Sequence, residues 1–487
     1  MKIYNSMTGK KEEFIPIDGN NVKMYACGVT VYDLSHIGHA RQAIVYAMIA
    51  DYLRFRGYNV KYVRNYTDVD DKIIKRANEH GKNALDFSRE QIAETEKDME
   101  NLHITDADIK TKASEYINEI IKFVETLIEN GSAYSTGNGD VYYRVRKFNE
   151  YGKLSHRNID DLLNGVRVEL EENKEDPLDF ALWKSAKPGE IYWESPWGNG
   201  RPGWHIECSV MALNTLGETI DIHGGGRDLV FPHHENEIAQ SEAFTGKEFA
   251  RYWSHCGLIK INGEKMSKSL GNSLTIRDAL KMYNYEVLKY VMISKHYASD
   301  IDIHDSDYQL AESHMYYFYN TIMKMQEFIE LYNGDKTGEK VEDDISNEIR
   351  EKFIKAMDDD FNTSAAIAEL HIDFKYINNL IKIAKKNNRQ QIANTLANIL
   401  EQIQKVYGVL GFFKQQPEEF IKQLREKYLE KINIEENYIT EQINKRAEAK
   451  KEKNFELADA IRTKLDEKGI ILNDTINGTT WDIKALY

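Results

Sequence analysis

The chain has 487 residues and a formal net charge of −15, from 79 acidic and 64 basic side chains. Because a typical domain has roughly 150 residues, we expect several domains, and the acidic balance excludes a protein that coats DNA along its length. A hydrophobic content of 41% excludes a disordered chain.

The cysteines and the N-terminal residues indicate a cytoplasmic protein. Three cysteines, Cys27, Cys208 and Cys256, cannot all pair, and the first residues contain no apolar stretch typical of an export signal. Because disulfides persist in oxidising compartments, we expect reduced thiols that are either buried or bound to a metal. The longest apolar run near the start, residues 43–50, is too short for a membrane helix of roughly 20 residues, so we expect no membrane association.

Strands and helices alternate in the N-terminal region. Apolar patterning predicts, in chain order, a strand, a helix, a strand and a helix at residues 22–26, 38–55, 60–63 and 70–79. This order is typical of a parallel α/β sheet, whose ligands bind at the carboxyl ends of the strands. Residues 27–39 are therefore expected at a ligand site. Residues from about 110 to 200 interrupt the pattern, and we interpret them as an insertion.

The distribution of proline separates the following part of the chain. Five of the seven prolines fall between Pro177 and Pro232, and none lies between His233 and Gln416. A stretch without proline permits long helices, and apolar residues recur at helical spacing over residues 308–332 and 345–412. We predict a Rossmann-type α/β domain with a parallel sheet over residues 1–309, followed by an α-helical bundle over residues 310–412.

The motif His36-Ile37-Gly38-His39 lies where the first strand passes into the first helix. Backbone N–H groups and the dipole at a helix N-terminus favour phosphate oxygens, and imidazole donors can stabilise charge that develops on phosphorus. Gly38 lets a nucleotide approach the backbone closely. Composition alone would produce this pattern only about 0.02 times in such a chain, so we interpret it as a nucleotide site.

A second motif, Lys265-Met266-Ser267-Lys268-Ser269, is flanked by Gly263 and Gly271. Two lysines three residues apart in such a loop can neutralise a triphosphate. Glycines at its flanks are typical of a segment that closes over a substrate. The alternative is an ordinary solvated loop, because lysine pairs are common.

Four dispersed side chains could hold a metal ion. His233 and Glu237 are four residues apart and would share one helix face, with Pro232 in the first turn. Cys27 and Cys208 could supply two thiolates, and this donor set suits zinc. The spacing is unlike a zinc finger, whose ligands come in close pairs. Alternatively, the cysteines are simply buried, and His233 caps the helix or pairs with a carboxylate.

A glycine-rich segment and two other positions are candidates for a ligand pocket. Three consecutive glycines, residues 224–226, follow His223 and shortly precede Asp228. Since they carry no side chains to pack, we expect a ligand to approach them closely; the alternative is a flexible hairpin loop. Trp204 is either core or pocket wall. Thr67, ahead of a helix, is interpreted first as an N-cap and only second as a ligand contact.

Together these motifs resemble the class I aminoacyl-tRNA synthetases, and within them the cysteinyl-tRNA synthetases. The resemblance extends over essentially the whole chain, at residues 24–41, 66–72, 151–157, 179–184, 204–208, 223–240, 265–269, 359–363, 458–462 and 478–481. The last two stretches resemble the family's anticodon-binding module. The resemblance therefore implies that a catalytic domain and a helical bundle are followed by a small anticodon-binding domain over residues 414–487.

The resemblance also implies roles for the candidate residues. One zinc ion per chain would be held by Cys27, Cys208, His233 and Glu237. ATP, accompanied by Mg²⁺, would be bound by His36, Gly38, His39 and Lys268. The residues active in catalysis would be His36, His39, Lys265 and Lys268. The amino-acid pocket would be lined by Thr67, Trp204, His223 and Asp228. The chain departs from the family pattern at residues 297–300 and at Ser364, both outside the reaction centre.

The activity that the resemblance implies is that of a cysteine–tRNA ligase. Such an enzyme forms cysteinyl-adenylate from L-cysteine and ATP and passes the cysteinyl group to the 3′ end of tRNA(Cys). Zinc would bind the substrate thiolate and so select cysteine against serine, because a thiol is readily deprotonated on a metal. Glu237 is then expected to be a weak or distant ligand. The alternative is an ATP-dependent cysteine ligase that acts on a small amino-sugar acceptor. We expect a monomer.

Residues 445–464 are candidates for contact with the tRNA backbone. They contain seven basic and four acidic side chains, a local positive excess in an acidic protein. Phe455 or Trp481 could stack on an unpaired base. The alternative is a solvated amphipathic helix with Phe455 and Leu457 in the core.

Overall fold

The structure, a computed structural model, describes residues 1–158, 173–261, 263–265, 273–475 and 478–484. The chain divides into two compact units. The first consists of Met1–Ile276, Lys295–Asp302 and Met357–Asn362, and the second of Arg277–Ser294, Ile303–Ala356 and Thr363–Tyr487. None of the helices described is both long enough and apolar enough to span a bilayer.

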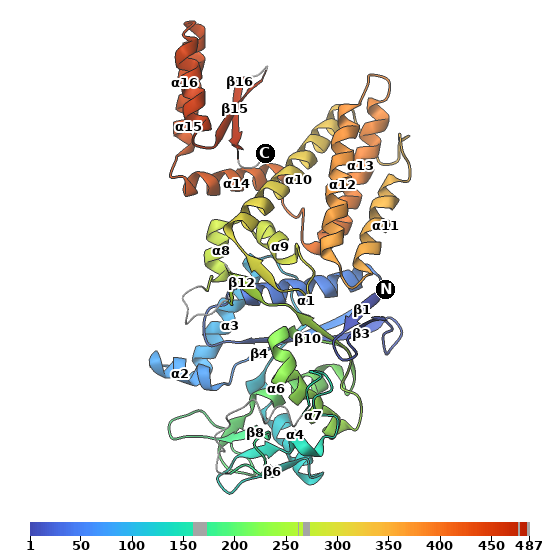
Figure 1. The fold of residues 1–487 in the computed structure, drawn as a ribbon, viewed down its shortest axis with the longest axis vertical. Helices are drawn as coiled ribbons and strands as arrows, with labels where there is room; N and C mark the ends of the chain where they lie inside the picture. The colour runs from blue at the N-terminus through green and yellow to red at the C-terminus, as the bar shows by residue number, and fades with distance from the viewer. Residues whose placement is uncertain (159–172, 262, 266–272, 476–477, 485–487) are drawn as a thin grey trace. The chain divides into compact units, whose positions relative to one another are not determined.

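A five-stranded parallel sheet forms the centre of the first unit (Figure 1). Its strands lie in the order β11-β10-β3-β4-β5, with bounds Ala250–Cys256, Ile220–Gly226, Asn21–Thr30, Asn59–Thr67 and Ile109–Lys112. The chain runs outward from β3 to β5 and then returns to β10 on the other side of β3. This doubly wound order places a topological switch point between β3 and β10. The Rossmann-type α/β fold expected from the sequence is confirmed.

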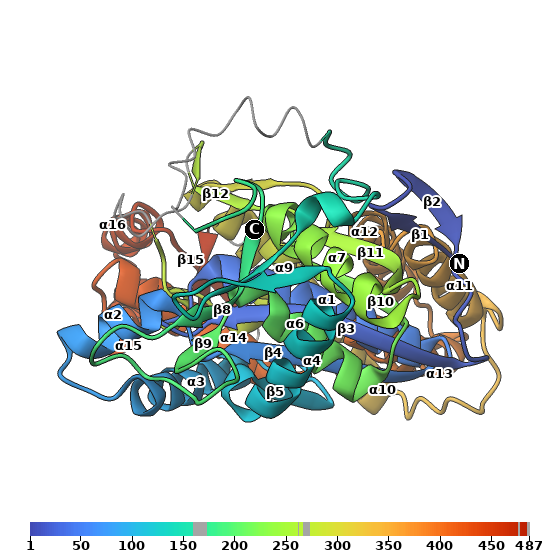
Figure 2. The same ribbon diagram turned by 90° about the horizontal axis from the view of Figure 1, so that it is seen from below.

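Helices cover both faces of this sheet. α1 (Ile37–Phe55) packs on one face and α6 (Trp204–Leu216) on the other (Figure 1). Seen from below in Figure 2, α6 and α4 (Ile117–Glu129) lie on the near side of β3 and β4. α1 ends at Phe55, and Gly57 follows its C-cap with a φ of 92°, a conformation that favours glycine.

Between β5 and α6 the chain leaves the parallel sheet. It forms a four-stranded antiparallel sheet in the order β6-β7-β8-β9, with bounds Ala133–Ser135, Val141–Tyr143, Phe180–Ser185 and Gly200–Pro202. Its core contains the fully buried Trp183 and Tyr143, packed with apolar residues of α4. This sheet falls within the residues, about 110 to 200, that we interpret as an insertion, and residues 159–172 lie outside the described range.

Further elements complete the first unit. A hairpin joins β1 (Lys2–Asn5) and β2 (Lys10–Glu13), and a small sheet has the order β13-β12-β14, with bounds Glu264–Lys265, Ile259–Ile261 and Ile301–Ile303. The remaining helices are α2 (Asp71–Glu79), α3 (Ala84–Asn101) and α7 (Glu235–Thr245).

Some element boundaries differ from the sequence prediction. β3 continues to Thr30, past the predicted end at residue 26, because it pairs with β4 again after an irregularity. α3 was not predicted. α7 begins at Glu235 and directly continues a helical turn over Val230–His234, in which only Phe231 is extended, with φ −138° and ψ 130°; Pro232 therefore lies in the turn that leads into α7.

The second unit consists mainly of helices. α10 (Asp305–Leu331), α12 (Thr363–Lys382) and α13 (Arg389–Tyr407) pack together. The fully buried Leu370, Phe374 and Ile377 recur at helical spacing along α12, which confirms the long helices expected there. The other elements are α8 (Ile276–Met282), α9 (Tyr285–Ile293), α11 (Ile345–Met357), α14 (Pro417–Lys431), α15 (Glu436–Lys451), α16 (Phe455–Asp466), β15 (Ile470–Thr475) and β16 (Gly478–Ile483).

Candidate active site and metal centre

Functional side chains gather at the switch point of the parallel sheet. Cys27 lies near the carboxyl end of β3, and His223 lies on β10, directly opposite Tyr25 of β3. The chain then passes from β3 into α1, which begins at Ile37. In open α/β sheets, ligands bind in the crevice outside the strand ends at such a switch point. These residues therefore lie where a ligand is expected.

His36 and His39 form a reciprocal cap at the start of α1. His36 Nδ1 accepts a hydrogen bond from His39 N–H, and His39 Nδ1 accepts one from His36 N–H, each at 3.4 Å. The two imidazole rings stack with centroids 3.7 Å apart, with Gly38 between them in the sequence. Because each Nδ1 accepts, a neutral ring carries its hydrogen on Nε2. The half-buried pair borders the positive end of the helix dipole, an environment that favours a phosphate.

The second motif adjoins the same helix end through its flanking residues. Ile37 N–H donates to Leu274 O at 3.0 Å, so the chain that follows the motif pairs with the start of α1. On the other flank, Lys265 lies on β13. Residues 266–272 fall outside the described residues, and with them Lys268, which was expected at ATP.

Cys27, Cys208, His233 and Glu237 converge on one buried point. Their ligand atoms all lie within 4.8 Å of one another, and none of the four residues is more than 2% exposed. Cys27 Sγ lies 3.8 Å from Cys208 Sγ, 3.6 Å from His233 Nε2 and 3.4 Å from Glu237 Oε1. His233 Nε2 lies 3.0 Å from Glu237 Oε1. The structure therefore brings together the four side chains predicted as metal ligands.

The chemistry of these four side chains fits a zinc ion. Two sulfurs, one imidazole nitrogen and one carboxylate oxygen are donors that zinc accepts. A hydrogen bond from Cys27, assisted by His233, lowers the pKa of Cys208 to about 6 despite burial. Although burial opposes ionisation, His223 and His233 hold the pKa of Glu237 well below its usual range. These shifts favour a buried thiolate and carboxylate beside His233, whose pKa Glu237 and Cys208 raise to about 10 despite burial, and a zinc ion would replace the proton of this imidazolium.

Two further histidines orient these side chains. His223 is fully buried, and its Nε2 lies 2.9 Å from Glu237 Oε2. His205 Nδ1 lies 3.0 Å from His233 Nδ1. Such contacts fix the orientation of metal-binding side chains. His223, which was expected to line the amino-acid pocket, therefore contacts the carboxylate of a candidate metal ligand.

Trp204 and Asp228 lie at the surface of this region. The Trp204 ring stacks on His233 with centroids 4.3 Å apart, and the residue is 37% exposed. It is therefore a wall of the site and not part of the core. Asp228 is exposed just after the end of β10, with its carboxylate close to the backbone of Gly226.

Thr67 is the last residue of β4 and is buried. The N-cap of α2 is Asp70, which accepts a hydrogen bond from Lys72 N–H at 2.8 Å. The interpretation of Thr67 as an N-cap is therefore wrong. Its side chain lies beside Glu207, a fully buried carboxyl whose pKa is raised well above its usual value, chiefly by burial.

The three glycines 224–226 end a buried strand. The alternative of a flexible hairpin is wrong, because all three belong to β10. A Cβ on Gly224 would lie 2.2 Å from the ring of Tyr46, and one on Gly225 would lie 2.7 Å from the ring of His234. At these two positions the space beside the backbone is filled by the protein's own side chains, so the expected approach of a ligand is not the reason for glycine.

The structure adds polar residues that the sequence analysis did not single out. His234 Nδ1 lies 2.9 Å from His255 Nε2. Burial lowers the pKa of His205, His234 and His255, so their rings are neutral near pH 7. Their only signal in the sequence is that His205 and His234 each directly neighbour a predicted site residue.

The C-terminal part of the second unit exposes an aromatic side chain beside lysines. Phe455, at the start of α16, is 61% exposed and follows the exposed Lys451 and Lys453. The alternative that placed Phe455 and Leu457 in the core is therefore wrong, since Leu457 is also exposed. Trp481 is buried, and the Arg425 guanidinium lies 5.2 Å from its ring centroid.

Residues 13–313 match the family described as tRNA synthetases class I (C) catalytic domain, and residues 352–414 match the DALR domain. The cysteine–tRNA ligase of Thermodesulfovibrio yellowstonii is 49% identical over 490 residues, which cover 99% of this chain and 100% of that protein. The chain belongs to the cysteine–tRNA ligase family. The cysteine–tRNA ligase of Syntrophotalea carbinolica is also 49% identical, over 483 residues that cover 99% of each chain.

Solved structures of other synthetases share the fold of this family member. Mycobacterium tuberculosis methionyl-tRNA synthetase in complex with methionyl-adenylate superimposes with a TM-score of 0.60 at 14% identity, covering 82% of this chain and 95% of that chain. A putative arginyl-tRNA synthetase from Campylobacter jejuni gives 0.55 at 12% identity, covering 81% and 94%. The resemblance to cysteinyl-tRNA synthetases is confirmed, and with it the expected class of enzyme.

Proposed function

We propose that this cysteine–tRNA ligase selects L-cysteine with a zinc ion held by Cys27, Cys208, His233 and Glu237. The observation that carries the proposal is the convergence of these four donors within 4.8 Å, with Cys27 lining the same pocket as His39. The enzyme forms cysteinyl-adenylate from L-cysteine and ATP, and transfers the cysteinyl group to the 3′ end of tRNA(Cys). Zinc, when bound, supplies a Lewis acid that prefers a thiolate to a hydroxyl.

The protein groups around the metal would leave a position for the substrate sulfur. Catalytic zinc sites usually have three protein ligands and one open position. Glu237 is the candidate for the weak ligand, because its two oxygens already contact His233 and His223. Trp204, which stacks on His233, would shield the site from water. Thr67 and Asp228, at the ends of the strands, would contact the main chain of the bound cysteine.

ATP, with Mg²⁺, would lie at the start of α1. His36 and His39 would donate from Nε2 to phosphate oxygens, and Gly38 leaves room for the nucleotide beside the backbone. Lys265 and Lys268 would neutralise the phosphates from the neighbouring segment. All four side chains would act by positioning ATP and by stabilising charge in the transition state.

The second unit would hold the tRNA, with the anticodon-binding domain over residues 414–487. Support comes from the DALR match and from the exposed Phe455 among lysines of residues 445–464. A ligase for a small amino sugar would have no use for such a module. We further propose that the enzyme works as a monomer in the cytoplasm, where its substrates ATP and tRNA occur.

Pyrophosphate exchange across all the amino acids, with zinc measured in the same sample, tests this proposal. We expect exchange with cysteine alone and about one zinc per chain. Metal-stripped enzyme should lose its preference for cysteine over serine and regain it when zinc is restored. Equal discrimination with and without the metal would contradict the proposal.

A further inference from the structure

The Cys27–Gly28 peptide lies at a β-bulge in the central sheet. β3 and β4 pair regularly up to Ala26 and Arg64, and pairing resumes at Val29 and Tyr66. Two residues of β3, Cys27 and Gly28, therefore lie opposite a single residue of β4. Bulges of this kind often lie beside active sites, where they redirect a side chain.

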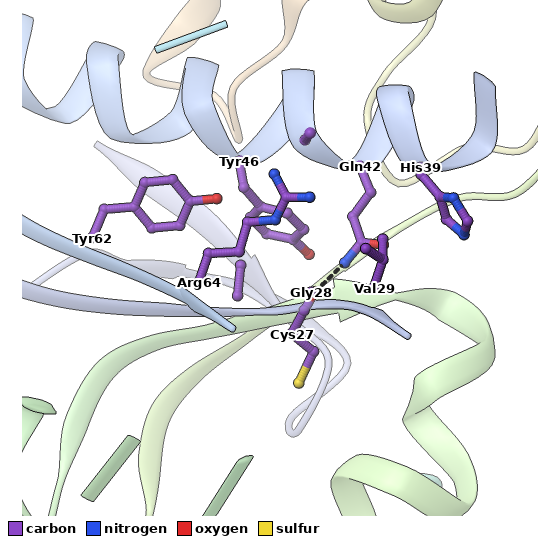
Figure 3. A pocket seen from close by; sticks show the side chains of 10 residues that line it. Cys27, Gly28, Val29, His39, Gln42, Tyr46, Tyr62 and Arg64 are labelled. Carbon is purple, nitrogen blue, oxygen red and sulfur yellow. Dashed lines mark hydrogen bonds between the residues drawn. The ribbon is translucent and has the colours of Figure 1, made fainter. Parts of the chain in front are cut away.

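Both polar atoms of this peptide group are bound by side-chain amides. Gln42 Nε2 donates a hydrogen bond to Cys27 O at 2.5 Å, and Asn65 Oδ1 accepts one from Gly28 N–H at 2.8 Å. Gln42 comes from α1 and Asn65 from β4, so the peptide is held by two different elements. We call these two side chains the amide clamp. In Figure 3, Gln42 reaches from α1 to the strand, while the Cys27 sulfur points away from α1.

Gly28 fits this clamp because it has no side chain. A Cβ built at this position would lie 1.6 Å from Asn65 O, far inside any permitted contact. Asn65 is itself only 1% exposed, so neither strand has room to move aside. The close approach of the two strands leaves the Gly28 N–H within reach of the Asn65 side chain.

We propose that Gln42 and Asn65 are positioning residues that aim Cys27 Sγ at the metal centre. Because its carbonyl and the following N–H are both bound, the plane of the Cys27–Gly28 peptide is held in one orientation, and this limits the directions in which the Cys27 side chain can leave the strand. In this arrangement the sulfur lies 3.8 Å from Cys208 Sγ and 3.4 Å from Glu237 Oε1. This inference rests on the proposed zinc site, to which it assigns two supporting residues outside the four ligands.

The competing explanation is that the amides only satisfy backbone groups exposed by the bulge. Both explanations expect variants of the clamp to be less stable, because buried backbone groups would lose their partners. They differ in what happens to the metal. Only the positioning role expects weaker zinc binding and an altered geometry of the Cys27 thiolate at the metal.

The experiment uses the full-length enzyme with Gln42→Met, which keeps the side-chain length but loses the donor, and Asn65→Leu, which loses the acceptor. Zinc release to a chelator and the thiolate-to-metal absorption of the Co²⁺-substituted protein are measured beside thermal unfolding. We expect metal affinity to fall about 10–100-fold in each variant, with a shifted or weakened thiolate band. Asn65→Asp keeps an acceptor for Gly28 N–H and should restore both.

Tyr52→Phe is the matched control. Tyr52 also lies on α1 and is fully buried, but its hydroxyl bonds Asp358 at 2.6 Å and does not contact Cys27. The Tyr52→Phe variant should have a lower unfolding temperature, with zinc affinity and the Co²⁺ spectrum unchanged. Clamp variants that behave like Tyr52→Phe would overturn this inference alone. Wild-type enzyme that binds no zinc would overturn the proposed site as well.

Discussion

His223 Nε2 lies 2.9 Å from Glu237 Oε2, the carboxylate oxygen that does not contact Cys27. The contact keeps one oxygen of Glu237 engaged, so only Oε1 faces the other candidate ligands. Replacing His223 by Leu should release Glu237 to bind the metal more closely and to compete with the substrate sulfur. We expect the KM for cysteine in pyrophosphate exchange to rise about 10–100-fold, with little change in the KM for ATP.

His80→Gln is the control for this prediction, since His80 is exposed at the end of α2. Its kinetic constants should equal those of wild type. If His223→Leu raised the KM values for ATP and cysteine equally, the contact between His223 and Glu237 would have no specific effect on cysteine binding.

Arg41 supports the chain segments on either side of the second motif. Its buried guanidinium donates to Gly257 O at 2.7 Å, Tyr297 O at 3.3 Å and Ser299 O at 2.6 Å. Arg41→Met removes this donor from all three carbonyls, of which Tyr297 O still accepts from Gly257 N–H, so we expect the free energy of unfolding to fall by about 3 kcal/mol. Gly257 precedes β12, and β12 pairs with β13, which carries Lys265 of the second motif. The KM for ATP should therefore rise as well.

The control for Arg41 is Arg89→Met. Arg89 and its partner Asp86 have side chains 67% and 66% exposed, and such pairs contribute less than about 0.5 kcal/mol. Calorimetric unfolding and pyrophosphate exchange on both variants provide the comparison. Equal stability of the two variants would contradict the supporting role of Arg41.

Asp373 makes the stability of the second unit depend on pH. Burial raises the pKa of this carboxyl to about 7, although the Tyr407 hydroxyl donates to it at 3.3 Å. Between about pH 4 and 7 the folded state then binds a proton that the unfolded state has lost, so stability falls as the pH rises. Asp373→Asn should remove this dependence and raise the free energy of unfolding at pH 8 by about 2 kcal/mol.

Calorimetric unfolding of wild type and Asp373→Asn at pH 4.5 and pH 8 checks this expectation. The two proteins should differ little at the lower pH. Asp343→Asn is the control, because the Asp343 side chain is 81% exposed. A variant that is stabilised equally at both pH values would show that the raised pKa is not responsible.

Phe455 is expected to contact an unpaired base of the tRNA. Base stacking on an aromatic side chain contributes about 1–3 kcal/mol, so Phe455→Ala should weaken tRNA charging about 5- to 150-fold. Pyrophosphate exchange, which needs no tRNA, should be unchanged. Leu457→Ala removes another exposed apolar side chain, 47% exposed, from the same helix and should affect charging little. Equal effects of the two variants would argue against stacking.

The sequence was sufficient for the main elements and for the four side chains that converge at the candidate metal centre. Apolar residues recur at helical spacing along α12, and α1 is a nearly continuous apolar run bounded by the His36 cap and Gly57, so local chemistry determines both helices. Cys27, Cys208, His233 and Glu237 have a rare donor chemistry and match a known family motif, which made them recognisable although they lie far apart in the chain. Pro232 favours the extended backbone observed at Phe231, and the chain turns into α7 directly after it.

The residues that support the site could not be predicted. Gln42, Asn65 and Arg41 are ordinary residue types, and their roles arise from contacts with distant parts of the chain. The sequence alone suggests that a ligand approaches Gly224 and Gly225, because no neighbouring residue indicates that the rings of Tyr46 and His234 occupy the adjacent space. Tertiary packing decides such positions, and neither periodicity nor residue spacing carries that information.

The segment that runs from the bulge at Cys27 and Gly28 to His39 has a consequence for engineering this enzyme. The short connection from Cys27 to His39 contributes both a candidate metal ligand and the imidazoles at the start of α1. Substitutions within this connection that aim to change the amino-acid selectivity would therefore also disturb the candidate nucleotide site. Substitutions on α6 and α7, which supply Cys208 and Glu237 from elsewhere in the chain, offer the safer route to altered selectivity.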